Sequence, residues 1–267
     1  MTEKTYKIRT GMGDTDIMEG MISFRSVVAA IRSGISDRRI EKVFFDRDKR
    51  VKNSRHLSYI IAMSHELSFD LEFADRETID QMSNGSSHGG IVTICSKRHL
   101  KPIEAGDIAR SGVYYILDGL EDPYNFGYSL RSIYASGADG VIIPERQTLD
   151  SAATISRSSA GASELLPIYT CKRESVIAMF KEVGYTAAAA DLEDATPMWD
   201  SDLRAPIVAV IGGEKRGISA DIADMCDIRV SIEYGRDFQL SLSAASAATL
   251  LSFEILRQNR GKSGSNP

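Results

Sequence analysis

The second half of the chain alternates short apolar runs with stretches of helical pattern. The runs are GVYYILD from residue 112, GVIIP from 140, YTAAAAD from 185, PIVAVIG from 206 and DIRVSI from 227. Because parallel strands need crossover connections, strands that alternate with helices indicate a mainly parallel sheet covered by helices. We therefore predict an α/β fold whose ligands bind outside the carboxyl ends of the strands.

A smaller α/β unit is predicted before this sheet. Apolar residues recur at near-helical spacing over residues 22–32, and Gly34 follows where a helix would stop. IEKVFF, FDLEFA and IVTIC have the pattern of strands, residues 54–67 have that of a helix, and Asp75 can cap a helix over RETIDQM. The expected division of the chain is a flexible N-terminus (1–15), a first domain (16–96), a charged linker (97–111), a second domain (112–260) and a flexible tail (261–267).

The composition is that of an ordinary globular protein. Of 267 residues, 43% are hydrophobic and 26% are charged, and no apolar run approaches the roughly 20 residues of a membrane helix. The first residues lack the apolar core of a secretory signal, so we expect a cytoplasmic protein without membrane partners.

The cysteines and histidines give no sign of a metal site. Cys95, Cys171 and Cys226 stand far apart without a CxxC pair, which favours buried thiols over a zinc site or a disulfide framework. The histidines show no ligand spacing; they are His56, His65, His88 and His99. No metal is expected.

A basic run stands out against the net charge of −5. The segment from Arg38 to Arg55 holds eight basic and three acidic residues, enough for a surface that attracts phosphate groups. A solvated loop and helix face is the alternative interpretation. The eight candidates for RNA binding are Arg38, Arg39, Lys42, Arg47, Lys49, Arg50, Lys52 and Arg55.

Three segments that follow predicted strands carry polar residues and glycines. EDPYNFGYSLR, from Glu121, puts Asn125 and Arg131 at a helix start, and IGGEKRGIS, from Ile211, puts two glycines before Glu214. The third segment is VSIEYGRDFQLSLSAASAA from Val230. Neither GxGxxG nor the phosphate-loop pattern is present, so an ordinary nucleotide site lacks its signature.

In this order, the three segments resemble the SPOUT superfamily of RNA methyltransferases, and within it the SpoU/TrmH family of ribose 2′-O-methyltransferases. The stretch from Asp122 resembles that family's first motif, AVIGGEKRGIS its second, and the third segment its last; the resemblance covers about residues 112 to 258. More loosely, the first domain is similar to the ribosomal-protein-like, RNA-capturing domain of such enzymes, including the His-Gly-Gly-Ile stretch at His88. A turn residue packed beside two glycines is the alternative interpretation of His88.

The resemblance implies a trefoil knot in the second domain and a homodimer formed through it. It also implies S-adenosylmethionine (AdoMet) as methyl donor, RNA as partner, and rRNA favoured over tRNA as substrate. Carried over by position, the residues near the donor are Gly212, Gly213, Gly217, Ile232 and Leu240.

For the chemistry, the resemblance singles out Arg131. Because guanidinium has a pKa above about 12, it is a poor base, and we expect Arg131 to stabilise the developing oxyanion or to bind the adjacent phosphate. Asn125 could position Arg131 or the ribose, and Glu214 could hold the guanidinium in an ion pair. The alternative interpretation is a helix-cap asparagine with a surface arginine.

One position departs from the family pattern. Where the last motif usually reads Ser-Leu-Asn-Val-Ser, this chain reads QLSLS, so Ser241 replaces the asparagine. Either Gln239 compensates, or the target nucleotide is held differently, or catalysis is weakened. A catalytically degenerate RNA-binding protein is therefore a second hypothesis. A nucleotide-dependent oxidoreductase is a third, which the missing GxGxxG disfavours.

Overall fold

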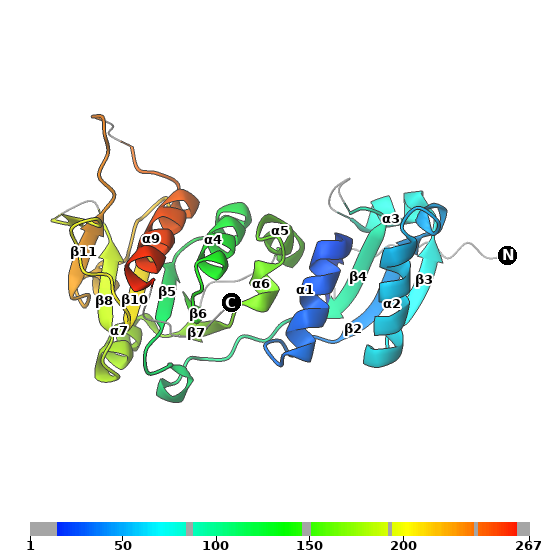
Figure 1. Ribbon diagram of the computed structural model, residues 1–267, viewed down its shortest axis with the longest axis horizontal. Helices are drawn as coiled ribbons and strands as arrows, with labels where there is room; N and C mark the ends of the chain where they lie inside the picture. Colours follow the sequence, from blue (N-terminus) through cyan, green and yellow to red (C-terminus); the bar gives the residue numbers. More distant parts are fainter. Residues whose placement is uncertain (1–14, 84–87, 146–150, 192–193, 238–239, 261–267) are drawn as a thin grey trace. The chain divides into compact units, whose positions relative to one another are not determined.

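The computed structural model describes residues 15–83, 88–145, 151–191, 194–237 and 240–260. These residues form two compact units, the first made of those described within 1–99 and 150–165 and the second of those described within 100–149 and 166–267 (Figure 1). No helix within the described ranges is long and apolar enough to cross a membrane.

The first unit contains a four-stranded sheet in the order β1-β4-β2-β3, in which only β2 and β3 run parallel. Its strands are β1 (Thr15–Glu19), β2 (Ile40–Asp46), β3 (Asp70–Ala74) and β4 (Ile91–Ser96), and its first three helices are α1 (Gly20–Arg32), α2 (Ser54–Leu67) and α3 (Arg76–Met82). The predicted cap of α3 is confirmed, because the Asp75 carboxylate accepts a hydrogen bond from the Thr78 N–H at 2.8 Å. The sequence pattern missed β1, which forms by pairing with β4 and buries Met18.

The second unit contains a seven-stranded sheet in the order β7-β6-β5-β10-β8-β11-β9, and each pair of neighbours in it is parallel, as predicted. The strands are β5 (Val113–Asp118), β6 (Gly140–Pro144), β7 (Ile168–Cys171), β8 (Thr186–Ala190), β9 (Thr196–Pro197), β10 (Ile207–Gly212) and β11 (Ile228–Ser231). The helices are α4 (Pro123–Ala135), α7 (Arg173–Glu182), α8 (Ala220–Ala223) and α9 (Ala244–Asn259). The core between sheet and helices includes Tyr114, Ile116 and Phe180.

The sheet order brings two distant motifs together. β10 lies beside β5 although several strands separate them in the chain, and Gly212 is the register partner of Asp118. The carboxyl ends of both strands therefore meet at one edge. Helix α4 starts just beyond that edge, where the Asp122 carboxylate accepts a hydrogen bond from the Asn125 N–H at 2.8 Å and Pro123 occupies the first turn.

Residues 151–165 pack with the first unit, although the predicted second domain includes them. They form α5 (Ala152–Ser158) and α6 (Ala162–Leu165), which contact β1 and α1. Their sequence pattern indicates a helix but not which sheet the helix covers, since partners distant in the sequence decide that. The structure thus differs from the expected boundaries at this segment.

The cysteine side chains are buried or half-buried. Burial raises the pKa of the Cys95, Cys171 and Cys226 thiols to about 12, so each remains neutral near pH 7. A neutral thiol is a poor nucleophile and a poor metal ligand.

Candidate active site

The loop that follows β10 folds back on itself. The Gly213 N–H donates to the Asp118 carbonyl oxygen and the Gly217 N–H donates to the Gly213 carbonyl oxygen, each at 2.9 Å. A Cβ on Gly212 would lie 2.2 Å from the carbonyl carbon of Gly217, and one on Gly213 would lie 2.2 Å from the Gly119 oxygen. Only glycine permits so close an approach of backbone segments. We call residues 212–219 the glycine loop.

A cavity of about 320 Å³ lies against the glycine loop. Asp191 and Glu214 contribute carboxylates to a lining that is otherwise mostly apolar side chains and backbone. Four of the five residues predicted to lie near a donor line it, namely Gly212, Gly213, Gly217 and Ile232. The fifth, Leu240, is not among the lining residues and is 69% exposed; Leu242, two positions later, lines the cavity instead.

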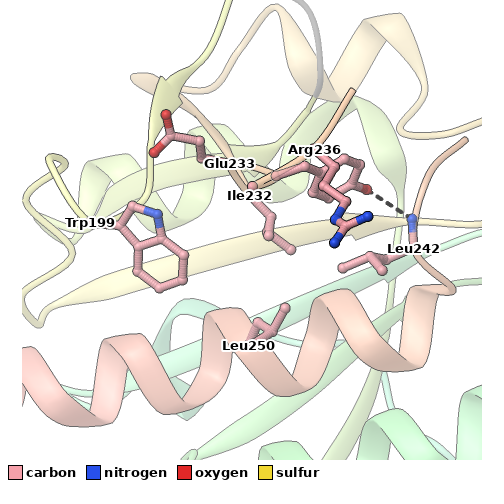
Figure 2. Close-up of a pocket in the computed structure, with 8 residues that line it drawn as sticks. Trp199, Ile232, Glu233, Arg236, Leu242 and Leu250 are labelled. Atoms are coloured by element: carbon pink, nitrogen blue, oxygen red, sulfur yellow. Dashed lines mark hydrogen bonds between the residues drawn. The ribbon is translucent and has the colours of Figure 1, made fainter. Parts of the chain in front are cut away.

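A second, more apolar cavity of about 550 Å³ adjoins the first (Figure 2). The two share Ile232, Tyr234 and Leu242, and the Tyr234 hydroxyl accepts a hydrogen bond from the Leu242 N–H at 3.0 Å. Trp199 and Leu250 line the second cavity and are 45% and 38% exposed. Part of the α9 surface is therefore apolar and open to solvent.

Asn125 and Glu214 meet as neighbours, although 89 positions separate them in the chain. The Asn125 Nδ2 donates to Glu214 Oε1 at 2.8 Å. This contact joins the first motif to a residue that lines the cavity.

Arg131 takes no part in the contact between Asn125 and Glu214. Its side chain is exposed and makes no hydrogen bond or ion pair with the described residues of this chain. Six positions along a helix correspond to a rotation of about 240°, so Arg131 and Asn125 lie on different faces of α4. Within one chain, Glu214 contacts Asn125 and not the arginine that the sequence led us to expect.

Ser241 lines the cavity and is exposed. Gln239, two positions earlier, is the candidate for compensating the missing asparagine, and it lies outside the described residues. Residues 1–14 and 261–267, which make up most of the expected flexible ends, also lie outside them. Ser243 caps α9 by accepting a hydrogen bond from the Ser246 N–H at 3.2 Å.

Sequence reasoning missed Asp118. It ends β5, is 2% exposed, and accepts hydrogen bonds from Arg173 Nε and from the Ser219 N–H, both at 2.9 Å. A single acidic residue after a strand-like run is a weak signal, because the partners that reveal its importance lie 55 and 101 positions away.

The basic run divides into three parts. Five of its residues gather at the carboxyl end of β2 and the start of α2; we call Arg47, Lys49, Arg50, Lys52 and Arg55 the basic surface. Lys49 is half-buried and the other four are exposed. Arg39 directly precedes β2 and Lys42 lies near the same end of it, so Arg39 is roughly 25 Å from Arg47 along the strand.

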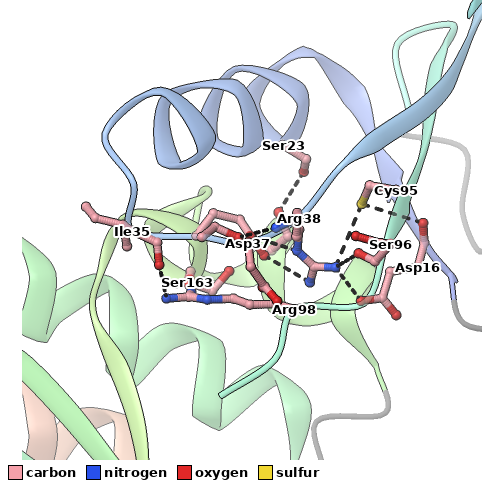
Figure 3. A network of polar contacts seen from close by, with 12 residues as sticks. Asp16, Ser23, Ile35, Asp37, Arg38, Cys95, Ser96, Arg98 and Ser163 are labelled. Atoms are coloured by element: carbon pink, nitrogen blue, oxygen red, sulfur yellow. Dashed lines mark hydrogen bonds and ion pairs between the residues drawn. The ribbon is translucent and has the colours of Figure 1, made fainter. Parts of the chain in front are cut away.

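Arg38 is buried and cannot belong to an RNA-binding surface (Figure 3). Its guanidinium donates to Glu164 Oε2 at 2.9 Å, to Asp16 Oδ2 at 2.6 Å and to the Ser96 carbonyl oxygen at 2.6 Å. The expectation that Arg38 binds RNA is therefore wrong: a run of charges in the sequence does not show which members form internal ion pairs.

His88 has the contacts of a structural turn residue. It is 1% exposed; its Nε2 lies 2.7 Å from Asp80 Oδ1, and its Nδ1 accepts a hydrogen bond from the Gly90 N–H at 3.0 Å. With Nδ1 as acceptor, Nε2 carries the proton and donates to the carboxylate. Both ring nitrogens are thus used in holding the turn.

Comparison with known proteins agrees with these motifs. The sequence profile of the SpoU rRNA Methylase family matches residues 112–253, and the profile for RNA 2′-O ribose methyltransferase substrate binding matches residues 24–100. A Staphylococcus haemolyticus protein assigned to the TrmH family of tRNA/rRNA methyltransferases is 30% identical over 235 residues, which cover 84% of this chain and 90% of that protein. A Staphylococcus saprophyticus protein with the same assignment is 29% identical over 213 residues, covering 76% and 83%.

Solved structures share the fold of the chain. An AdoMet-bound rRNA methyltransferase from Sinorhizobium meliloti superposes with a TM-score of 0.75 at 21% identity, covering 91% of this chain and 87% of that one. The SpoU methyltransferase AviRb from Streptomyces viridochromogenes, in complex with AdoMet, gives 0.73 at 19% identity, covering 92% and 90%. With its α/β fold like that of SPOUT methyltransferases, its profile match over residues 112–253 and its 30% identical relative, the chain belongs to the SpoU rRNA methylase family of RNA methyltransferases.

Proposed function

We propose that this protein transfers a methyl group from AdoMet to a ribose 2′-hydroxyl of structured RNA, with rRNA favoured over tRNA. The observation that carries the proposal is the cavity against the glycine loop, with Glu214 in its wall and Asn125 bonded to Glu214. The match of the first unit to a substrate-binding profile supports RNA as the partner.

The cavity residues suit AdoMet. The cavity volume of about 320 Å³ falls within the range of small-molecule sites, and the tight glycine loop offers backbone groups close to a ligand. Ile232 and Leu242 supply apolar walls, while the carboxylates of Asp191 and Glu214 suit a cationic ligand. When bound, AdoMet supplies the electrophilic methyl group.

Asn125 and Arg131 have different tasks in this mechanism. Glu214 holds the Asn125 amide nitrogen, and the amide oxygen has no partner among the described residues, so it can accept a hydrogen bond from a ribose hydroxyl. Arg131 stabilises the oxyanion that develops as the hydroxyl oxygen attacks, or binds the adjacent phosphate, and the proton leaves to phosphate or water.

The proposal includes a homodimer. Tyr124, Tyr128 and Arg131 follow at helical spacing along α4, and the tyrosines are 49% and 48% exposed. On α9, which packs against α4, Leu250 and Phe253 are 38% and 45% exposed. Burying these faces against a second copy would cover apolar surface and let Arg131 of one protomer complete the site of its partner.

A trefoil knot is also part of the proposal, on the strength of the family resemblance. The position of β10 between β5 and β8 supports it, as does the packing of the glycine loop against Gly119.

The basic surface gives a prediction about salt. Changing Arg47, Arg50 and Lys52 together to glutamate should weaken RNA binding and reduce the slope of log K against log salt by about 2 to 3, because each phosphate contact contributes roughly 0.7 to 0.9. Filter binding at several salt concentrations measures the slope. The matched control changes two exposed arginines and one exposed lysine elsewhere on the first unit, Arg25, Arg32 and Lys97; equal slopes for the two triple variants would eliminate the basic surface.

The proposed function is tested with tritiated AdoMet and deproteinised RNA from cells that lack this protein. Label should enter an rRNA fraction, and RNA from cells that contain the protein should accept much less, because its target is already methylated. RNA binding without label in any fraction would instead favour a catalytically degenerate RNA-binding protein. That is the second hypothesis, which rests on Ser241 in place of the family asparagine.

A further inference from the structure

The buried Asp118 holds both ends of the glycine loop. Its backbone carbonyl oxygen accepts from the Gly213 N–H at 2.9 Å, and its Oδ2 accepts from the Ser219 N–H at 2.9 Å. One residue of β5 thus fixes the segment that forms a wall of the cavity. The profile match places Asp118 in the methylase region but gives it no task.

The two carboxylate oxygens of Asp118 have separate partners. Both the Nε and the Nη2 of Arg173 lie on Oδ1, at 2.9 and 2.8 Å, and this leaves Oδ2 to Ser219. The Asp118 side chain is 2% exposed and that of Arg173 is 42% exposed. A carboxylate buried to this degree is unfavourable unless it is paired and hydrogen-bonded, and Arg173 supplies the pairing charge from the start of α7.

The geometry of Ser219 makes its backbone N–H, and not its side chain, the important group. Its φ of −63° and ψ of 141° put it before α8 as the N-cap, yet its side chain makes no cap hydrogen bond. Its Oγ is buried without a hydrogen-bond partner among the described residues. The bond from the Ser219 N–H to Asp118 therefore ties down the far end of the glycine loop.

We propose that Asp118 is a positioning residue for AdoMet binding: it holds the glycine loop in the binding conformation through the Ser219 N–H, and Arg173 orients its carboxylate by binding Oδ1. This inference rests on the proposed function, because it assigns AdoMet to the cavity. Asp118 acts through the loop and need not touch the donor.

The test compares two substitutions at one position. Proline has no N–H and prefers a φ near −65°, so Ser219→Pro removes the donor at a residue whose φ of −63° already suits proline. Ser219→Ala keeps the N–H and removes only the unpartnered hydroxyl. The AdoMet Kd, measured by calorimetry well below the unfolding temperature, should rise about 10-fold or more for Ser219→Pro and stay within about threefold of wild type for Ser219→Ala.

Substitutions of Asp118 give a second comparison. Asp118→Ala removes the acceptor and should raise the AdoMet Kd as Ser219→Pro does, whereas Asp118→Asn keeps an oxygen that can accept from Ser219 and should recover much of the affinity. Val208→Ala is the control for lost stability, since Val208 is buried in β10, four positions before the loop.

The AdoMet-binding results for wild type, the Ser219 variants and Val208→Ala test different parts of the inference. If wild type binds AdoMet and Ser219→Pro binds it equally well, Asp118 does not position the loop. If Val208→Ala weakens binding as much as Ser219→Pro, the effect is one of general stability and the inference falls. If folded wild type does not bind AdoMet, the proposed function fails first. The Ser219 pair decides the question even where Asp118→Ala does not fold.

Discussion

Replacing Arg131 with alanine is expected to reduce methyl transfer by roughly 10²-fold or more, the scale of losing one group that stabilises an oxyanion. The AdoMet Kd should change little, because Arg131 is not among the residues that line the cavity. Single-turnover transfer from tritiated AdoMet gives the rate, and calorimetry gives the affinity.

Arg131→Lys is the matched variant, because it keeps the positive charge but loses the planar fork of donors. We expect its rate to lie between those of wild type and Arg131→Ala. Equal losses of AdoMet affinity and transfer rate in Arg131→Ala would contradict the assigned role and indicate that Arg131 supports the donor site.

Mixed dimers test whether Arg131 acts on the site of its own chain. In the proposed homodimer Arg131 serves the site of the partner, and its exposed position on a different face of α4 from Asn125 is compatible with that role. Arg131→Ala and Glu214→Ala subunits are each expected to be nearly inactive alone. Co-expressed, they would form heterodimers with one intact site, so activity should recover to a measurable fraction of wild type. If both residues served one site of the same chain, no heterodimer would contain an intact site and activity would stay at background.

The second large effect is expected at Arg38. Arg38→Met should lower the free energy of unfolding of the first unit by about 3–5 kcal/mol, because it leaves a buried carboxylate without its cation. The side chain of Glu164 is 4% exposed, and the Ser96 carbonyl oxygen also loses its donor. Denaturant unfolding, followed by a probe of the first unit, measures the change.

Two further variants identify the cause. Arg39→Met, at the adjacent exposed position, should change stability by no more than about 0.5 kcal/mol. The double variant with Arg38→Met and Glu164→Leu should recover much of the loss, since it removes both charges of the pair. A loss below about 1 kcal/mol for Arg38→Met would show that the buried pair contributes little to holding α6 in the first unit.

The sequence predicted best those features that short segments determine. The parallel strands, the Asp75 cap and the glycines of the loop follow from local pattern, steric limits and motif order, and the structure agrees with them. Gly212, Gly213, Gly217 and Ile232 do line one cavity, but Leu242 takes the position expected of Leu240.

What the sequence did not show depends on contacts between distant segments. Asn125 meets Glu214 across 89 positions, and Arg38 meets Glu164 across 126, so no local pattern in the sequence shows that the members of each pair are partners. The same limit applies to β1, which forms only by pairing with β4, and to α5 and α6, which pack with the unit that precedes the methylase motifs.

The position of the transferred methyl group on the RNA decides whether this protein methylates ribose or a base. After reaction with tritiated AdoMet, the labelled RNA is hydrolysed in alkali, which cleaves each linkage that has a free 2′-hydroxyl. Methylation of a ribose blocks cleavage at that nucleotide, so we expect the label to elute in alkali-resistant dinucleotides. Label in mononucleotides would place the methyl group on a base and contradict transfer to a ribose 2′-hydroxyl.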